Sequence, residues 1–202
     1  MIDKNNFFSI IYHFVFAITS SAVGAVIASW PLLMIFVLVQ KTYKVVNLSI
    51  GQIMGNYNQL LWYLIWPLKK KLRMSNLPTS MAAAQHFADV KKLFTIVIIA
   101  FLCCLILYFW NSKSKKSFFR LNKICALLLL LLPVAALPFA LTNFDQFFIN
   151  FHHLFFIGST TWLFNPETDP IINLLTEGFF AACFAVGGTI YELYFANQLL
   201  QR

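Results

Sequence analysis

The sequence predicts an all-α membrane protein with four transmembrane helices, and two observations support this fold class. The 202 residues are 60% hydrophobic and 11% charged and include 23 Phe, a composition outside the usual range of soluble proteins. The chain also contains four apolar segments close to or above the roughly 20 residues that a helix needs to cross a bilayer. The predicted spans are Phe7–Val39, Leu93–Trp110, Ile124–Leu141 and Leu174–Tyr191.

The first apolar segment is long for a single membrane crossing. Phe7–Val39 contains no charged residue and would reach roughly 50 Å as one helix. It must therefore tilt, protrude or break, and Trp30-Pro31 is the predicted break. No small-residue cleavage pattern closes this segment, so we interpret it as an anchor rather than a cleavable signal peptide. We expect residues 1–202 to form a single integral membrane domain.

Residues 40–92, between the first two spans, predict an extracellular helical cap. Val45–Met54 places apolar and polar residues at helical spacing. Leu60–Leu68 is an apolar and aromatic run that is too short to cross a bilayer but suits an interfacial helix ending at Pro67. The lysines that follow, Lys69-Lys70-Lys71, can engage anionic lipid. The cap then either roofs a lipid site or only covers the membrane surface.

Loop charge predicts the orientation of the spans. Asn111–Lys123 holds five basic residues and no acid, whereas Thr142–Asn173 holds three acidic residues and no Lys or Arg. The positive-inside rule places the first loop in the cytoplasm and the second, at about 142–173, outside. Residues 40–92 are then also external, although they include eight basic residues. This segment is near the length at which the rule loses force.

Two histidine-bearing segments lie on the same membrane side in any four-span arrangement. His86 precedes the second predicted span, while His152 and His153 lie between the third and fourth. Because imidazole can both take and give a proton near neutral pH, their meeting at a membrane surface indicates chemistry. Adjacent residues cannot share a helix face, so we expect only one of His152 and His153 to point inward. His13 lies within the first predicted span, and we expect it to be a hydrogen-bonded intramembrane histidine.

The surroundings of the two histidines permit two interpretations each. Asp89 follows His86 by three residues, so on a helix it either orients the imidazole or caps the second span. The Phe-rich segment Phe144–Phe156, followed by Trp162, either holds acyl chains and excludes water or packs the loop onto the membrane.

Several other chemistries are disfavoured by the sequence. All four cysteines fall inside predicted spans, which argues against disulfides and an exposed thiol nucleophile. Ser80 precedes His86 by six residues but lies in no recognisable nucleophile elbow. The basic residues flank the spans, so we expect no nucleic-acid partner. A zinc site matches no standard ligand spacing, although it is conceivable from His86, Asp89, His152 and His153.

With these residues the chain resembles the lipoprotein intramolecular transacylases of Gram-positive bacteria. The resemblance covers nearly the whole chain, and its specificity lies in the order and spacing of several short motifs. One departure is Thr176, where the family pattern has Pro before the Glu. The motifs are His86-x-x-Asp89-Val90-Lys91, Phe144-Asp145-x-x-Phe148, Phe151-His152-x-x-Phe155-Phe156, Trp162-Leu163-x-Asn165-Pro166-x-x-Asp169 and Glu177-x-Phe179-Phe180.

The resemblance implies transfer of the sn-2 acyl chain of a lipoprotein's diacylglyceryl group to the α-amine of its lipidated amino-terminal cysteine. The product is a lyso-form lipoprotein. It implies His86 and His152 as catalytic residues, one as base and the other as hydrogen-bond donor, with Asp89 supporting His86. His86 is first assigned as the base, although the roles could be exchanged. The implied substrate contacts are Tyr57, Phe151, Phe155, Phe156 and Trp162.

The implied reaction sets expectations for partners and cofactors. Conversion of an ester to an amide is downhill, so we expect neither a cofactor nor a metal. The expected partners are a diacylglyceryl-modified lipoprotein and membrane lipid. We expect a multi-pass monomer in the cell membrane, with the active site at the extracellular interface.

Two alternatives from other functional classes stay open at this point. One is a non-enzymatic membrane transport or assembly protein, although Glu192 lies at the inner end of the last span and indicates no intramembrane charge path. The other is a lipid acyltransferase or esterase that uses Ser80 and His86 through a covalent intermediate.

The predicted orientation can be tested by cysteine labelling in intact cells. We predict that a cysteine replacing Thr168 reacts with a membrane-impermeant thiol reagent, because the charge of its loop places it outside. A cysteine replacing Ser114 should stay unlabelled until the cells are permeabilised. The reverse pattern would place both histidine segments on the cytoplasmic side.

Overall fold

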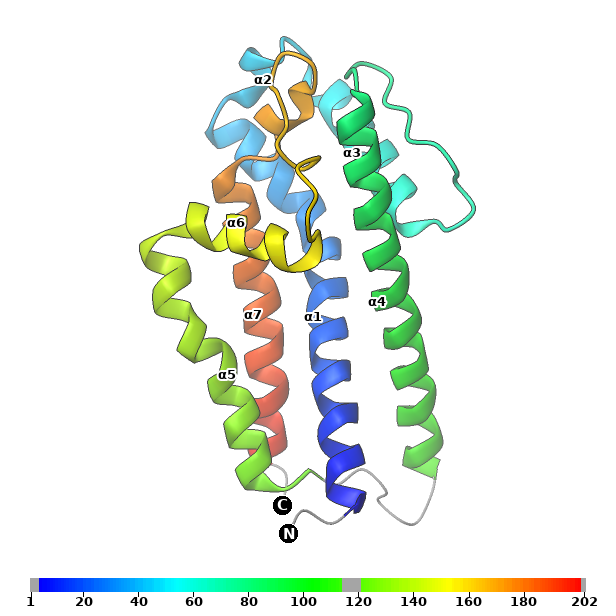
Figure 1. Cartoon of the computed structure of the whole chain (residues 1–202), viewed down its shortest axis with the longest axis vertical. Helices are drawn as coiled ribbons and strands as arrows, with labels where there is room; N and C mark the ends of the chain where they lie inside the picture. The colour runs from blue at the N-terminus through cyan, green and yellow to red at the C-terminus, as the bar shows by residue number, and fades with distance from the viewer. Residues whose placement is uncertain (1–3, 114–120, 201–202) are drawn as a thin grey trace. The chain divides into compact units, whose positions relative to one another are not determined.

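The structure, a computed structural model, describes residues 4–113 and 121–200. Residues 114–120, which carry much of the basic charge used for the predicted orientation, lie outside this part of the chain. The described residues form seven α-helices and one 3₁₀ helix and no strand, which confirms the predicted all-α class (Figure 1). The helices are α1 (Lys4–Val39), α2 (Thr42–Val45), α3 (Ile50–Ile65), α4 (Met81–Lys113), α5 (Lys123–Thr142), α6 (Phe144–Phe155), η1 (Pro170–Asn173) and α7 (Glu177–Leu200).

Four helices are long and apolar enough to cross a membrane, as the sequence predicts. By length and composition the candidate spans are Phe7–Val39, Met81–Trp110, Lys123–Thr142 and Glu177–Leu200. Large apolar side chains are exposed along all of them, which is expected of surfaces that face lipid. Helix α4 begins at Met81 rather than near Leu93, because hydropathy detects the apolar stretch and not the helical turns before it.

The predicted break at Trp30-Pro31 is wrong. Helix α1 continues through Pro31 to Val39, although Pro31 has no N–H to donate to the carbonyl oxygen of Ile27. Helix α5 likewise contains two prolines, Pro133 and Pro138. Proline is tolerated in apolar spanning helices because local adjustments and neighbouring groups satisfy the carbonyl that it frees.

Contacts divide the chain into two compact units, to which α1, α4 and α7 each contribute residues. The membrane unit takes its described residues from Met1–Ile27, Val97–Thr142 and Phe184–Arg202. The cap unit comprises Ala28–Ile96 and Asn143–Cys183. Both predicted catalytic histidines belong to the cap unit.

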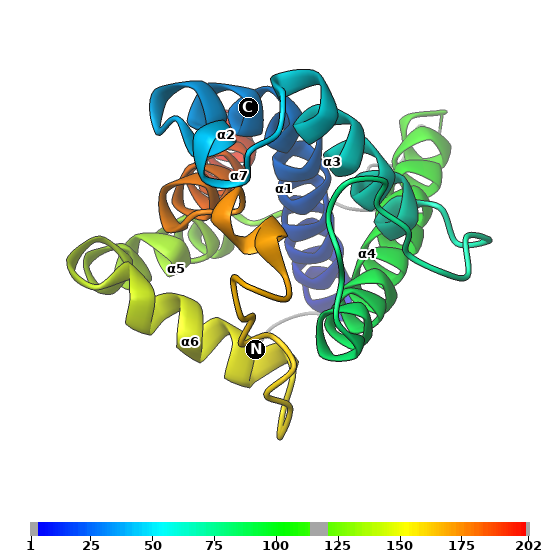
Figure 2. The same cartoon turned by 90° about the horizontal axis from the view of Figure 1, so that it is seen from above.

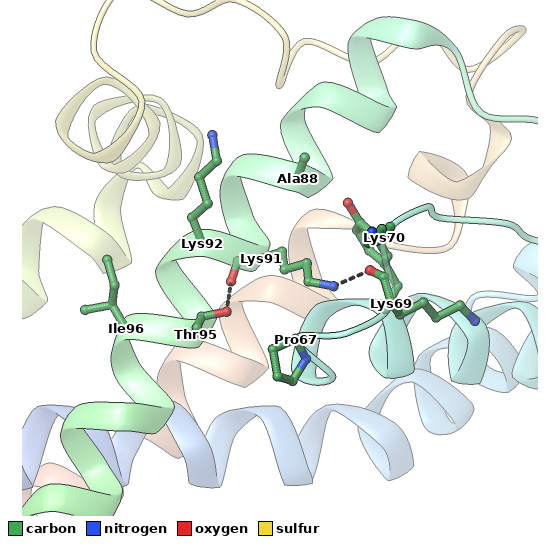
Figure 3. Close-up of a pocket in the computed structure, with 9 residues that line it drawn as sticks. Pro67, Lys69, Lys70, Ala88, Lys91, Lys92, Thr95 and Ile96 are labelled. Carbon is green, nitrogen blue, oxygen red and sulfur yellow. Dashed lines mark hydrogen bonds between the residues drawn. The ribbon is translucent and has the colours of Figure 1, made fainter.

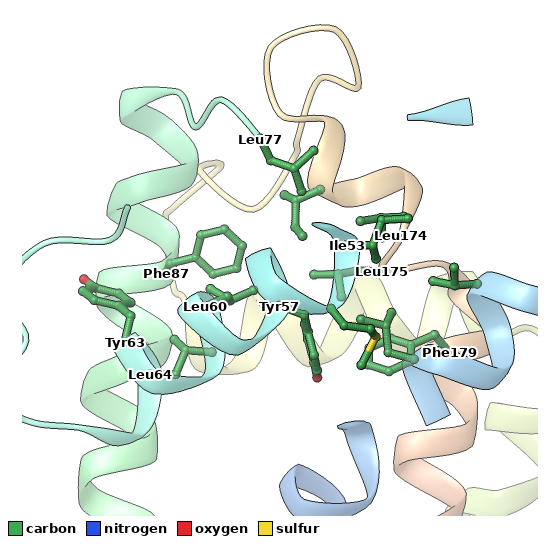
Figure 4. Close-up of a cluster of buried hydrophobic side chains, with 14 of the residues drawn as sticks. Ile53, Tyr57, Leu60, Tyr63, Leu64, Leu77, Phe87, Leu174, Leu175 and Phe179 are labelled. Atoms are coloured by element: carbon green, nitrogen blue, oxygen red, sulfur yellow. The ribbon is translucent and has the colours of Figure 1, made fainter. Parts of the chain in front are cut away.

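Helix α3 supplies the centre of the cap unit's core. Ile53, Tyr57, Leu60 and Leu64 recur at intervals of three or four residues and are all buried. Figure 4 shows side chains of this helix lying between Phe87 of α4 and the segment that leads into α7. The core continues there through Ile171, Leu174, Leu175 and Phe179.

The sequence around α3 fixes both of its ends. Ser49 forms a capping box, in which its Oγ accepts the Gln52 N–H and the Gln52 side chain accepts the Ser49 N–H. The helix ends at Ile65, and Trp66 has an extended conformation because Pro67 disfavours the α region in the residue before it. The segment between the first two spans is therefore helical, as predicted, but its main helix is Ile50–Ile65 and ends two residues before Pro67.

The membrane unit has its own core and contains the predicted intramembrane histidine. Ala17, Ala126, Tyr191 and Phe195 are buried together with Leu121. His13 Nδ1 lies 2.6 Å from the Tyr194 hydroxyl, which confirms the predicted hydrogen bond. The four cysteines are free.

Helix α3 provides a matched pair of stability predictions. Ser49→Ala should lower the free energy of unfolding by about 1 kcal/mol, since one orphan N–H of the helix loses its acceptor. Gly55→Ala should raise it by up to about 1 kcal/mol, because a Cβ there meets no atom within 4 Å and alanine favours helix. Thermal unfolding in detergent, followed by circular dichroism, measures both. If Ser49→Ala and Gly55→Ala changed the free energy of unfolding equally, the assignment of Ser49 as the N-cap of α3 would be contradicted.

Candidate active site

The structure brings the rings of His86 and His152 together within the cap unit. His86 lies on α4 and His152 on α6, and their ring centroids are 5.6 Å apart with an interplanar angle of 34°. Each residue is only 6% exposed. Two imidazoles from different helices thus share one buried, water-poor space, which is where proton transfer is best controlled.

Ser80 fixes the start of the helix that carries His86. Its Oγ accepts the Ala83 N–H at 3.1 Å, as an N-cap side chain does. Its own N–H donates to the Asp169 carboxylate at 2.6 Å. His86 follows this capped end within two turns, so its position depends on where α4 begins.

Helix α6 places His152 in its last turn and fixes the tautomer of its ring. The helix starts at Asn143, whose side chain accepts the Gln146 N–H at 3.0 Å. His152 Nδ1 lies 2.8 Å from the Phe148 carbonyl oxygen one turn earlier. Because a carbonyl oxygen only accepts, Nδ1 carries the hydrogen and donates it. In the neutral ring Nε2 then keeps a free lone pair.

An aromatic cage surrounds the two imidazoles. Phe156 and Phe164 meet the His86 ring edge-on, with centroids at 4.7 and 5.6 Å. Trp162 stacks on the His152 ring at 4.7 Å, and Phe148 lies 4.2 Å from it. We call these four residues, Phe148, Phe156, Trp162 and Phe164, the aromatic cage. Aromatic faces stabilise an imidazolium transiently while they exclude water.

A turn after α6 returns the chain toward His152. Gly158 has a φ of 74°, in the left-handed region that favours glycine. The Trp162 indole N–H then donates to the Ser159 carbonyl at 3.0 Å, which fixes the plane of the stacked ring. Figure 2 shows the coil that follows, running from the end of α6 to the start of α7.

Asp169 joins this coil to the start of α4. The residue is 3% exposed, and one carboxylate oxygen accepts the Ser80 N–H while the other accepts the Thr168 hydroxyl at 2.9 Å. Its own N–H donates to the Asn165 carbonyl at 2.8 Å, which tightens the turn before it. The segment that carries Trp162 and Phe164 is therefore tied to the helix that carries His86.

Burial favours the neutral imidazole of His152. Desolvation lowers the pKa of His152 below its ordinary value, and the neighbouring His153 lowers it further. The hydrogen bond to the Phe148 carbonyl opposes this shift but does not reverse it. The ring is therefore an available proton acceptor at neutral pH.

His86 has an unused nitrogen. Its Nδ1 is buried and has no hydrogen-bond partner among the residues that the structure describes. A buried polar atom without a partner is costly, and such atoms in folded proteins call for a specific explanation. A bound substrate that supplies the missing partner is one such explanation.

Asp89 does not contact the His86 ring by a hydrogen bond in the described part of the chain. Its carboxylate accepts from the Gln85 amide at 3.2 Å and pairs with Lys92 at 2.8 Å. The alternative that Asp89 caps the helix is wrong, because α4 begins at Met81 and Ser80 is its cap.

The other residues singled out by sequence are distributed around the site. His153 is exposed while His152 is buried, as expected for adjacent residues on one helix. Phe151 lies beside His152 and packs on the half-exposed Phe155, with centroids 4.7 Å apart. Tyr57 lies in the cap core and donates to the Ser29 hydroxyl at 2.7 Å. Burial raises the pKa of Tyr57, which keeps the phenol neutral.

Sequence reasoning missed three contributions to the site. Phe164 completes the cage, the Phe148 carbonyl fixes the His152 tautomer, and Asp169 holds the coil to α4. The four-residue spacing between Phe148 and His152 could have indicated the hydrogen bond that fixes the tautomer, since on a helix the Nδ1 of His152 can reach the Phe148 carbonyl. The Asp169 contact spans 89 residues, and no local pattern signals it.

A family model gives the decisive comparison. The model described as "Lipoprotein intramolecular transacylase Lit" matches residues 7–180. This chain belongs to the Lit family. No curated protein matches it. As a Lit family member, the chain is a membrane acyltransferase of lipoprotein maturation.

Solved structures of one relative share the fold. The membrane-integral lipoprotein intramolecular transacylase Lit from Bacillus cereus is 23% identical, with a TM-score of 0.80. The match covers 95% of this chain and 89% of the other. Two structures of histidine variants of that protein, one with arginine and one with alanine, are each 21% identical and have TM-scores of 0.72 and 0.70. Both matches cover 96% of this Lit chain. They cover 88% of the arginine variant's chain and 90% of the alanine variant's chain.

The Asp169 contact can be tested by replacing its carboxylate. Asp169→Ala should lower the free energy of unfolding by about 1–3 kcal/mol, because the Ser80 N–H loses its charged acceptor. Glu167→Ala is the control, since it removes the same charge from an exposed side chain two residues away. Thermal unfolding of both variants in detergent gives the comparison. Equal melting temperatures would show that the Asp169 contact contributes nothing to stability.

Proposed function

We propose that this Lit family member moves the sn-2 acyl chain of a diacylglyceryl lipoprotein onto the α-amine of the lipidated amino-terminal cysteine. The observation that carries the proposal is the pair of buried imidazoles, His86 and His152, with ring centroids 5.6 Å apart. Family membership supports the reaction class. The residues at the site support the proton handling that this class requires.

The reaction needs proton transfer but no external energy source. The amine nitrogen attacks the ester carbonyl, an N–C bond forms, and the C–O bond to the glyceryl carbon-2 oxygen breaks. Starting from the neutral amine, one proton leaves the nitrogen and one proton ends on the glyceryl oxygen. The nucleophile belongs to the substrate, so the protein supplies proximity, proton transfer and stabilisation of the oxyanion.

His152 suits the role of base. Its Nδ1–H is engaged by the Phe148 carbonyl, so the neutral ring has only Nε2 to offer, as an acceptor. After Nε2 takes the amine proton, the same N–H can pass it to the departing glyceryl oxygen. A relay of this kind typically contributes about 10²–10⁴-fold in rate. This assignment exchanges the roles first given to the two histidines.

His86 then suits the role of donor to the oxyanion. Its Nδ1 has no partner in the described part of the chain, so the protein does not fix the tautomer through that nitrogen. A donor of this kind in a desolvated site is typically worth about 10²–10³-fold. Asp89 supports the site indirectly, because its carboxylate holds Gln85 on the preceding turn of α4 and Lys92 on the following turn.

The aromatic residues are proposed to hold the acyl chains. Phe156 and Trp162 border the imidazoles directly, whereas Phe151 and Phe155 extend the apolar surface along α6. Tyr57 lies in the core and has no contact with either histidine in the described part of the chain, so its role is to support the cap.

We place the site at the extracellular membrane interface of a multi-pass monomer that is surrounded by lipid. His86 precedes the apolar stretch that starts at Leu93 by seven residues, roughly 10 Å along a helix. The acidic loop Thr142–Asn173 carries His152 and lacks Lys and Arg, which favours the outer side.

Replacing either histidine should abolish conversion. His86→Ala and His152→Ala should each remove the lyso-form product while the protein still accumulates in the membrane. Ser80→Ala should keep its activity and lose about 1 kcal/mol of stability, because Ser80 caps α4. Mass spectrometry of a lipoprotein's amino-terminal peptide, from cells expressing each variant, measures the product. An inactive Ser80→Ala variant at normal protein levels would favour the covalent alternative.

The two adjacent histidines should differ in their importance. His152→Gln should be inactive and His153→Gln should stay substantially active, because His152 is buried beside His86 while His153 is exposed. EDTA should leave conversion by the purified enzyme unchanged. A metal site built from the pair would instead lose activity with either substitution and on chelation. One conversion assay with both variants and the chelator separates the two mechanisms.

A further inference from the structure

A basic groove lies between α4 and the end of α3, on residues that the proposed reaction does not use. It has a volume of about 390 Å³, and its lining includes Lys69, Lys70, Lys91 and Lys92 but no Asp or Glu (Figure 3). All of its residues belong to the cap unit. Four lysines around one groove concentrate positive charge at the start of a candidate membrane span.

The Lys91 ammonium group is bound by other groups of the protein, and these contacts shape the groove. Its Nζ donates to the Trp66 carbonyl at 2.9 Å and to the Lys69 carbonyl, and it lies 4.4 Å from the centre of the Tyr63 ring. Figure 3 shows this side chain reaching from α4 toward the chain at Lys69. The lysine therefore satisfies the carbonyl of Trp66, the C-cap of α3, and that of Lys69 in the turn that follows, and it joins this segment to α4.

The remaining lysines differ in how far they are neutralised. Lys92 pairs with Asp89 at 2.8 Å, and that carboxylate is the acid that offsets the groove's charge. Lys69 and Lys70 have no side-chain hydrogen bond or ion pair within the part of the chain that the structure describes. Their ammonium groups are available to an anion, and each flexible side chain can turn toward one.

Apolar groups next to the lysines indicate a lipid rather than a soluble anion. Ile96 is 64% exposed at the lower edge of the groove, and the apolar stretch of α4 continues beyond it. Trp62 and Trp66 directly precede the lining residues Tyr63 and Pro67 in the sequence, and their rings stack at 5.1 Å and are about half exposed. Indole rings favour headgroup depth, so these features place the groove where headgroups meet acyl chains.

We propose that this groove binds an anionic phospholipid, with Lys69 and Lys70 at its headgroup phosphate and an acyl chain along Ile96. The excess of positive charge selects an anionic lipid over a zwitterionic one. The groove is separate from the two imidazoles, so this proposal does not depend on the proposed reaction.

The test compares lipid binding by the full chain and by a variant with two charges removed. Native mass spectrometry in detergent measures retention of dimyristoyl phosphatidylglycerol against dimyristoyl phosphatidylcholine. The double variant Lys69→Gln/Lys70→Gln should lose the preference for phosphatidylglycerol by about tenfold or more, since each lysine near a membrane surface contributes substantially to anionic binding. The control Lys41→Gln/Lys44→Gln removes the same charge from the cap outside the groove and should keep the preference.

Three results would overturn the proposal. The first is an unchanged preference in the Lys69/Lys70 variant, with circular dichroism confirming that it folds. The second is an equal loss in the control, which would indicate diffuse attraction to the whole cap. The third is displacement of the lipid by inorganic phosphate at equal concentration, which would indicate a free-anion site. The lyso-form product is measured in the same preparations, so a failure of lipid binding is distinguished from a failure of the proposed reaction.

Discussion

The hydrogen bond from the Ser80 N–H to the Asp169 carboxylate is the contact on which the candidate site depends. It links the start of α4 to the coil between α6 and α7, two segments 89 residues apart in the sequence. On one side of the bond lies the helix with His86, and on the other lies the coil with Trp162 and Phe164. Together with the contact of Phe164 on Phe87, this bond holds the coil and its part of the cage against α4. Because the carboxylate is buried, its bond to the N–H is shielded from competing water.

The proximity of the two imidazoles disfavours simultaneous protonation of both rings. A positive charge on one ring disfavours protonation of another at this separation, and the surrounding aromatic side chains provide little solvation. That constraint suits an acyl transfer from ester to amide, in which a single proton moves from nitrogen to oxygen. A site in which both imidazoles were permanently charged would be a poorer proton acceptor. In the proposed mechanism the cage contributes to the chemistry as well as to the packing.

Hydropathy predicted the fold class and the four spans, because both depend on local sequence, whereas the choice of His152 over His153 came from the family resemblance. The 3.6-residue period shows only that His152 and His153 point in different directions, so that one of them at most faces inward. Other features depend on contacts between distant segments. The support of the cage depends on the bond between Asp169 and Ser80, 89 residues away. The start of α4 depends on the local cap Ser80, which hydropathy does not detect. The predicted break at Pro31 was wrong because a local rule was applied to an apolar helix that tolerates proline.

Burial alone does not distinguish the catalytic candidates from other histidines in this chain. His13, His86 and His152 are each 6% exposed, so all three are equally withdrawn from solvent. Their hydrogen bonds separate them. His13 Nδ1 pairs with the Tyr194 hydroxyl, as a structural histidine in an apolar span must. His152 uses Nδ1 for a backbone carbonyl and so directs its basic nitrogen elsewhere, while His86 Nδ1 has no partner in the described part of the chain. A buried imidazole that the fold leaves unsatisfied costs stability, and binding of a substrate with a complementary polar group would recover that cost.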